Sequence, residues 1–202
     1  FTAWALLGLA AARKHPLDVT AGGRSGVDFM RSRAGELNDL GEISRTILVL
    51  RAGGLDARSF AGRDLVGELL DKRRPDGSFA GRVNTTSFAV FALRASGRST
   101  RDPVVRRAGR WIASQANDDG GVNFDGKGAA SGVDDTAAAV QALAASGRRS
   151  TTTVKRAASF LVRRQNADGG FPLAPGGVSN AQSTAFAVQA LIAAGRDVSK
   201  IR

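Results

Sequence analysis

Residues 184–195 read TAFAVQALIAAG, an apolar segment built mainly from small side chains. Its apolar residues cover almost every side of a helix, which is typical of a helix buried between neighbours, and its glycine is a natural helix stop. Four other segments share this pattern, two closely and two in degraded form. They are TAAAVQALAASG (136–147), TSFAVFALRASG (86–97), ISRTILVLRAGG (43–54) and TAWALLGLAAAR (2–13).

The five segments form an internal repeat. They begin at residues 2, 43, 86, 136 and 184, which places them 41 to 50 residues apart. Recurrence at this period is typical of a repeated two-helix unit. Because strand patterns are nearly absent, we expect an all-α protein of about five helical hairpins.

A second, amphipathic type of helix precedes the apolar type in each unit. In one copy the apolar side is formed by Val104, Ala108, Trp111 and Ile112, with Gln115, and the opposite side by Arg106, Arg107 and Arg110. In the next copy Val154, Ala157, Ala158, Leu161 and Val162 lie opposite Lys155, Arg156 and Arg163. The alternation predicts two layers, with amphipathic helices outside and small-residue helices inside.

A glycine-containing turn follows the outer helix in three units. The turns read PDGSF (75–79), DGGV (119–122) and DGGF (168–171). Asp-Gly and Gly-Gly supply the backbone conformations of a tight reversal. We expect the apolar residue after the glycines to fold back onto the core.

Composition excludes several classes of function. The net charge is +11, but the arginines are dispersed along the chain and there is no tyrosine, so we predict solvated helix faces and no specific nucleic-acid site. No apolar run is long enough for a transmembrane segment. With no cysteine and one histidine, His15, we expect no metal site, and nothing in the sequence calls for a cofactor.

Two stretches carry a family resemblance. WIASQANDDGGV (111–122) and FLVRRQNADGGF (160–171), each followed by a small-residue helix, resemble the repeat of terpenoid cyclases and protein prenyltransferases. The resemblance implies an α/α toroid in which inner helices ring a cavity, and it implies that Trp111, Gln115 and Gln165 tie neighbouring units together.

The number of hairpins bears on domain organisation. A complete toroid of this family has more hairpins than the five inner segments found here. We therefore expect residues 1–202 to form one incomplete or open toroid domain and to be a fragment of a longer chain. The remainder of that chain, or an oligomer partner, would complete the ring.

Within this superfamily the composition is compatible with one type of enzyme reaction. Zinc prenyltransferases need cysteine and histidine ligands, which argues against that activity. Class II terpene cyclases, which are isomerases, begin an inner helix with Asp-x-Asp-Asp-Thr-Ala, and GVDDTA (132–137) matches except at Gly132. The resemblance implies that Asp134 donates a proton and Asp135 is its partner. Such an acid must be kept neutral by burial and a nearby like charge.

Two functions remain open. One is a squalene- or terpene-cyclase-like domain that binds an apolar, isoprenoid-type small molecule and starts its cyclisation at Asp134. The other is a non-catalytic ligand-binding or structural repeat module of a larger protein, secreted or not, in which the two aspartates merely cap a helix. Polar residues at the corresponding helix starts would form the ligand rim: Asn84, Thr85, Gln182 and Ser183.

Overall fold

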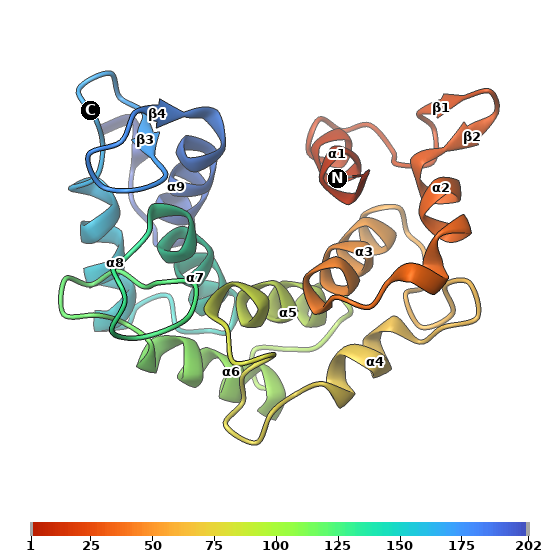
Figure 1. The fold of residues 1–202 in the computed structure, drawn as a ribbon, viewed down its shortest axis with the longest axis horizontal. Helices are drawn as coiled ribbons and strands as arrows, with labels where there is room; N and C mark the ends of the chain where they lie inside the picture. The colour runs from red at the N-terminus through yellow and green to blue at the C-terminus, as the bar shows by residue number, and fades with distance from the viewer. Residues whose placement is uncertain (1, 201–202) are drawn as a thin grey trace. The chain divides into compact units, whose positions relative to one another are not determined.

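The computed structural model describes residues 2–200, and most of this segment is helical (Figure 1). The nine α-helices within it are α1 (Thr2–Ala11), α2 (Gly26–Ser32), α3 (Leu40–Ala52), α4 (Leu65–Asp71), α5 (Val83–Ala95), α6 (Pro103–Ser114), α7 (Val133–Ala145), α8 (Thr152–Val162) and α9 (Ala181–Ala193). The 3₁₀ helices are η1 (Ala34–Glu36) and η2 (Val198–Lys200). The all-α prediction is confirmed.

Two small antiparallel hairpins complete the secondary structure of the described residues. In the first, β1 (Thr20–Ala21) pairs with β2 (Arg24–Ser25), and in the second, β3 (Phe171–Pro172) pairs with β4 (Ser179–Asn180). The second hairpin joins the turn after α8 to the start of α9.

The two helix types alternate as predicted. The five small-residue segments form the odd-numbered helices α1 to α9, and an outer helix lies between each successive pair. The start of α3 is capped by Asp39, whose side chain accepts a hydrogen bond from the Glu42 N–H, and Asp102 caps α6 in the same way.

Contacts divide the chain into two compact units. One holds residues up to 73 together with 91–98, and the other holds residues 74–90 and those from 99 onward. Helix α5 therefore contributes residues to both units. That residues 1–202 act as a single domain stays a prediction.

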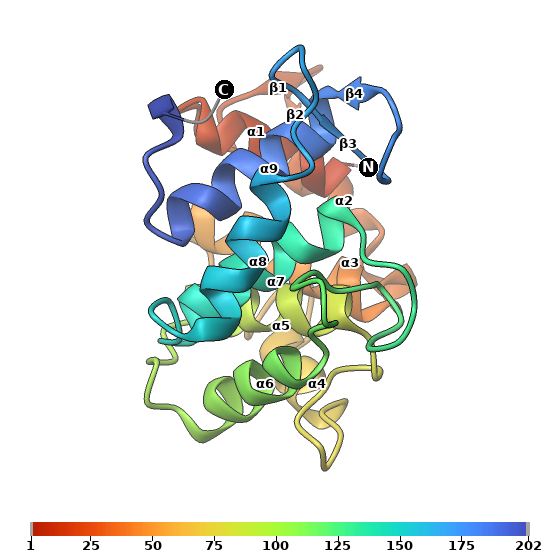
Figure 2. The same ribbon diagram turned by 90° about the vertical axis from the view of Figure 1, so that its left-hand side faces the viewer.

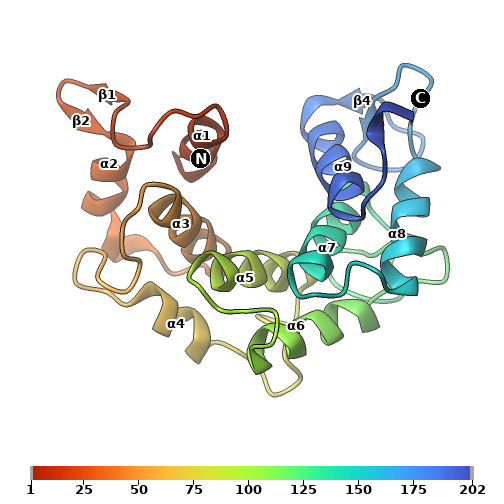
Figure 3. The same ribbon diagram turned by 180° about the vertical axis from the view of Figure 1, so that it is seen from behind.

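In the first unit, α3 packs against α1 and α4 (Figure 3). Its core includes Ile47, Leu50 and Leu65, which are fully buried. Arg63 binds η1 to α4, because its guanidinium donates to the carbonyls of Ala34 and Leu37 and pairs with Glu68 at 2.5 Å.

In the second unit, α7 packs against α6, α8 and α9. Figure 2 shows α8 in front of α7 and α6 below it. Eight of the thirteen residues of α7 are buried and none is exposed; the buried ones include Val133 and the run from Thr136 to Val140. Small side chains let neighbouring helices approach this closely, which explains the alanine content of the repeat.

A threonine near the start of three inner helices fixes the turn before it. Thr136 Oγ1 accepts a hydrogen bond from the Val122 N–H at 3.0 Å, and Thr86 and Thr184 accept in the same way from Phe79 and Phe171. These three acceptors hold the residue that follows each glycine turn. Val122, Phe79 and Phe171 are all buried, so the expectation that this residue folds back onto the core is confirmed.

The buried stripes of the outer helices differ from the prediction. Helix α6 buries Val105, Ala108, Gly109 and Ile112, whereas Val104 and Trp111 are only half-buried. The stripe is displaced because Gly109, which has no side chain, lets Ser146 approach the helix closely. In α8, Phe160 is buried, and Val162, predicted to be on the apolar side, is 38% exposed.

Two inner helices also depart from the expectation that they are buried between neighbours. In α1 only Leu6 is buried, and Ile192 of α9 is 54% exposed. Among the described residues, the inner helix that packs on α1 is α3 and the one that packs on α9 is α7. Each of these helices therefore buries one side.

The residues expected to tie the units together play different parts. Trp111 lies next to Asp76 in the preceding turn, where its indole helps to lower the pKa of that carboxyl, so it does link two neighbouring repeats. Gln115 instead accepts from the Lys127 N–H at 3.3 Å, and Gln165 donates to the Gly169 carbonyl at 2.8 Å. Both amides therefore stabilise the loop that follows their own helix, and for them the expectation was wrong.

Candidate functional site

The aspartate pair lies in the first turn of α7. The N-cap residue is Gly132, and no side chain makes a capping hydrogen bond to this helix start. Asp134 and Asp135 are the second and third helical residues, where the helix dipole favours negative charge. The interpretation of the pair as helix caps is therefore wrong.

Asp134 is half-buried and is held by the neighbouring inner helix. Its Oδ2 accepts a hydrogen bond of 3.0 Å from Gln182 Nε2 at the start of α9. Its Oδ1 is buried and has no hydrogen-bond partner within the part of the chain that the structure describes. A buried carboxylate oxygen without a donor is costly, which makes this side of the pair a suitable place to take up a proton or a ligand group.

The surroundings of Asp135 favour the protonated form of its carboxyl group. Burial raises its pKa to about 6, and the negative charges of Asp134 and Asp125 act in the same direction. A hydrogen bond from the Phe124 backbone N–H opposes this rise. Burial and like charges therefore outweigh the hydrogen bond, and the carboxyl is largely neutral below this pH.

The loop from 122 to 132 lies next to this site and leads into α7. Its carbonyl at Phe124 accepts the Val83 N–H at 3.1 Å, and the Arg82 guanidinium lies 5.2 Å from the Phe124 ring centre. Phe124 and Asp125, which shape the pKa of Asp135, were not predicted as site residues. The only signal was their place between the Asp119 turn and the aspartate pair.

The four predicted rim residues do not behave alike. Gln182 is exposed and contacts Asp134, as described above. Asn84 and Thr85 are half-buried at the start of α5, and no hydrogen bond joins them to the pair among residues 2–200. Ser183 is buried, and its N–H and hydroxyl bond to Asn180, the N-cap of α9.

Ser131, directly before Gly132, forms its side-chain hydrogen bonds with the preceding turn and not with the aspartate pair. Its hydroxyl donates to Asp119 Oδ1 at 2.9 Å and accepts from Asn117 Nδ2 at 3.0 Å. Ser179 makes the corresponding bonds to Asp168 and Asn166 in the last unit. The repeated Asn-x-Asp-Gly-Gly pattern was the sequence signal of this network.

Aromatic side chains accompany two of the rim residues. Phe88 comes four residues after Asn84, and Phe186 four residues after Gln182, so each ring shares a helix face with a polar residue one turn earlier. Ala138 takes this position after Asp134. The pattern combines polar groups at the helix starts with apolar surface one turn along.

The described residues also bear on metal binding and on the membrane. No group of three or more His, Cys, Asp or Glu residues in residues 2–200 is arranged to hold a metal ion. His15 is exposed, and its Nδ1 lies 3.8 Å from Asp18 Oδ1. No described helix combines the length and apolar character of a membrane span.

The comparison with known families covers both the repeat and the aspartate pair. Residues 43–174, more than half of the chain, match the family model of the squalene-hopene cyclase C-terminal domain. A search of curated proteins gave no significant match. The matched range contains helices α3 to α8 except for the first three residues of α3, and it includes Asp134 and Asp135. The chain therefore belongs to the squalene-hopene cyclase C-terminal domain family, whose fold is the α/α toroid.

Proposed function

We propose that this chain binds an apolar, isoprenoid-type ligand and starts its cyclisation by proton transfer from the Asp134–Asp135 pair. The observation that carries the proposal is the pair of adjacent carboxyl groups in the first turn of α7, where burial and the Asp134 charge raise the pKa of Asp135 to about 6. A proton donor to an alkene must be a neutral, desolvated carboxyl group, and this environment favours that form.

The two aspartates have different roles in this proton transfer. Asp134 supplies the like charge that helps to keep Asp135 protonated, and Gln182 fixes its orientation through the 3.0 Å hydrogen bond. In the initiating step the carboxyl O–H bond breaks and the alkene π pair forms a new C–H bond. A carboxylate and a tertiary carbocation result, and the cation is attacked by the next double bond of the chain.

The resemblance assigns the donor to Asp134, and the environment favours Asp135 as the residue that stores the proton. Both assignments need the pair intact. The buried Oδ1 of Asp134 supports a direct role as well, because it has no hydrogen-bond partner among the described residues and can contact a ligand group.

An apolar ligand is supported by the aromatic residues that share faces with the polar rim. Phe88 is buried and Phe186 is half-buried. Faces of aromatic rings stabilise positive charge that develops on a ligand, by about 0.5–2 kcal/mol for each contact.

The direct test incubates the chain with squalene or 2,3-oxidosqualene and identifies cyclic products by gas chromatography–mass spectrometry. We expect conversion that decreases above about pH 6 as Asp135 loses its proton. Loss of the acid should lower the rate by about 10²–10⁴-fold in both Asp134→Asn and Asp135→Asn. The control is Asp118→Asn, which removes an exposed carboxylate outside the site and should retain activity. Conversion that is unchanged in both test variants would refute acid initiation at this pair.

The second candidate is non-catalytic binding of the same kind of ligand, or a structural role. It is favoured by one observation, the glycine at 132 where cyclases of this type carry the first aspartate of the motif. Saturable binding of an unreactive saturated polyprenyl analogue in calorimetry, without any conversion of squalene, would support binding alone.

A further inference from the structure

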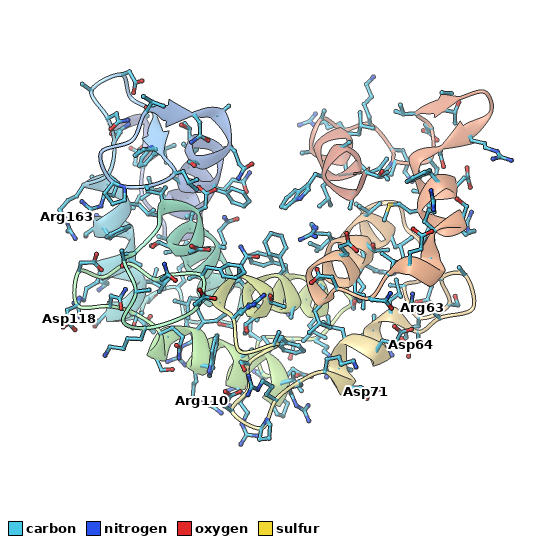
Figure 4. All side chains as sticks on the ribbon, in the orientation of Figure 1. Arg63, Asp64, Asp71, Arg110, Asp118 and Arg163 are labelled. Atoms are coloured by element: carbon cyan, nitrogen blue, oxygen red, sulfur yellow. The ribbon has the colours of Figure 1, made fainter. Side chains whose placement is uncertain are left out.

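The outer side of α8 carries a hollow that the proposed cyclase site does not use. Its volume is about 400 Å³, and it is lined by Lys155, Arg156, Ser159 and Arg163 of α8 and by Asp118 and Asp119 of the turn after α6. Figure 4 labels Arg163 and Asp118 at this side of the second unit.

The cations of the hollow have no acidic partners. Among the described residues, none of Lys155, Arg156 and Arg163 forms an ion pair with a carboxylate. The Asp119 carboxylate is already occupied, because it accepts from the Gly121 N–H at 2.9 Å and from the Ser131 hydroxyl. The Asp118 carboxylate is exposed and is the one uncommitted acid in the lining.

Backbone carbonyls hold the two guanidinium groups in position. Arg163 Nη2 donates to the Asp119 carbonyl at 2.9 Å, and Arg156 Nη2 donates to the Asp118 carbonyl. A guanidinium has five N–H donors, so most of them remain available for a ligand. A third guanidinium, that of Arg196, donates to Ser159 Oγ at 3.4 Å. Donors fixed in advance bind an anion with a smaller loss of side-chain entropy.

The preceding repeat shows why the hollow exists at α8. The stretches 111–121 and 160–170 correspond residue for residue, so Lys155, Arg156 and Ser159 correspond to Arg106, Arg107 and Arg110 of α6. The contacts agree, because a Cβ placed on Gly120 would meet the Arg156 carbonyl and one on Gly77 the Arg107 carbonyl. A short serine thus stands where α6 has the long side chain of Arg110, and it leaves room between the cations.

We propose that this hollow binds a phosphate group. Arginine forks match the geometry of phosphate oxygens. The Ser159 hydroxyl already donates to the Lys155 carbonyl at 3.0 Å, so this residue contributes space between the cations. The group can be a free phosphate or phosphomonoester, or the headgroup phosphate of a lipid, because the same donors recognise each of them.

The first experiment titrates the whole chain with inorganic phosphate at constant ionic strength, with chloride as the reference anion, and follows binding by calorimetry. We expect saturable binding of phosphate and none of chloride. Arg163→Ala should weaken the affinity about tenfold, the usual effect of losing a charged hydrogen bond. Arg106→Ala, which removes the same charge from the outer layer at α6, is the matched control and should bind as the wild type does.

Ser159→Arg separates a built site from general attraction by positive charge. The variant adds a cation but fills the hollow, as Arg110 does at the corresponding position of α6. We expect phosphate binding to be lost in Ser159→Arg and strengthened in Asp118→Asn, which removes the free acid of the lining. Far-UV circular dichroism checks that each variant is folded. Unchanged or tighter binding by Ser159→Arg, or an equal loss in Arg106→Ala and Arg163→Ala, would overturn the proposal.

A second experiment distinguishes the sources of the phosphate. Flotation with phosphatidylcholine vesicles, with and without phosphatidic acid, tests a lipid headgroup. Binding that requires phosphatidic acid and is lost in Ser159→Arg assigns the headgroup, whereas binding of free phosphate without flotation assigns a soluble ligand. If neither phosphate nor phosphatidic acid binds the wild-type chain, the proposal is wrong.

Discussion

Asp135 retains its proton to a higher pH in the folded chain, where its pKa is about 6, than its ordinary value of 3.8 allows. Between these values the folded state binds more protons than the unfolded state, so the free energy of unfolding falls as the pH rises from about 4 to about 6. We expect a loss of about 2 kcal/mol, allowing for the partial exposure of the group. Asp135→Asn should abolish this decrease, as measured by urea unfolding across that range.

The control for this prediction is a carboxylate with the opposite shift. The pKa of Asp168 is lowered by its hydrogen bonds from Ser179 and the Gly170 N–H. Its contribution to stability is present above its ordinary pKa and is lost as the pH falls. Asp168→Asn should therefore destabilise the chain at neutral pH and leave the decrease between about pH 4 and pH 6 in place. A decrease that persists in Asp135→Asn would assign it to another group.

Gly132 determines how strongly the pair interacts with the helix start. Its φ of −101° is open to any residue, and a Cβ there would lie 3.1 Å from Asp135 Oδ2. Gly132→Asn should supply the missing cap and stabilise the chain by about 0.3 kcal/mol, because glycine is itself a tolerated N-cap residue. Gly132→Asp adds a third carboxylate next to Asp135, so we expect the pKa of Asp135 to rise above about 6. Carboxyl ¹³C titration by NMR measures it, and a pKa equal to that in Gly132→Asn would contradict the prediction.

At the scale of helices and turns, two glycines at corresponding positions allow a controlled comparison of the same substitution. Gly120 (φ +90°) and Gly169 (φ +83°) occupy the same position of successive turns. A Cβ on Gly120 would lie 2.8 Å from the Arg156 carbonyl oxygen, whereas one on Gly169 has no atom within 4 Å. Gly169→Ala should cost about 1–2 kcal/mol for the left-handed backbone alone. Gly120→Ala should cost about twice as much, because α8 must also move. Equal losses in thermal unfolding would show that the contact with α8 is unimportant.

The helices themselves could be predicted from the sequence because the same helix pattern recurs in each repeat. All five small-residue segments form helices, and the turns fold back where the glycines indicate. The side of α6 that is buried could not be predicted from apolar residues, since Gly109 lies in the contact with Ser146. The pKa of Asp135 depends on Phe124 and Asp125, which belong to a loop outside the motif. Motif spacing gave the location of the pair, but its electrostatics come from tertiary contacts.

At the scale of the whole molecule, α5 matters most because its residues belong to both compact units. Val83 to Val90 belong to one unit and Phe91 to Ala95 to the other, within one unbroken helix. Partial unfolding of either unit would remove packing from α5 and weaken the other. We therefore expect residues 1–202 to unfold in one cooperative transition.

The two tryptophans test this expectation, because each unit contains one of them: Trp4 in α1 and Trp111 in α6. In Trp111→Phe the fluorescence reports on the first unit, and in Trp4→Phe on the second. Within each variant the urea midpoint from fluorescence should equal that from far-UV circular dichroism, which reports on all helices. Adding Ala89→Gly to α5 should lower the free energy of unfolding by about 1 kcal/mol or more, because glycine weakens a helix interior, and the urea midpoints of both tryptophan variants should fall together. Midpoints that separate would mean that the two units unfold independently and that the chain is not a single domain.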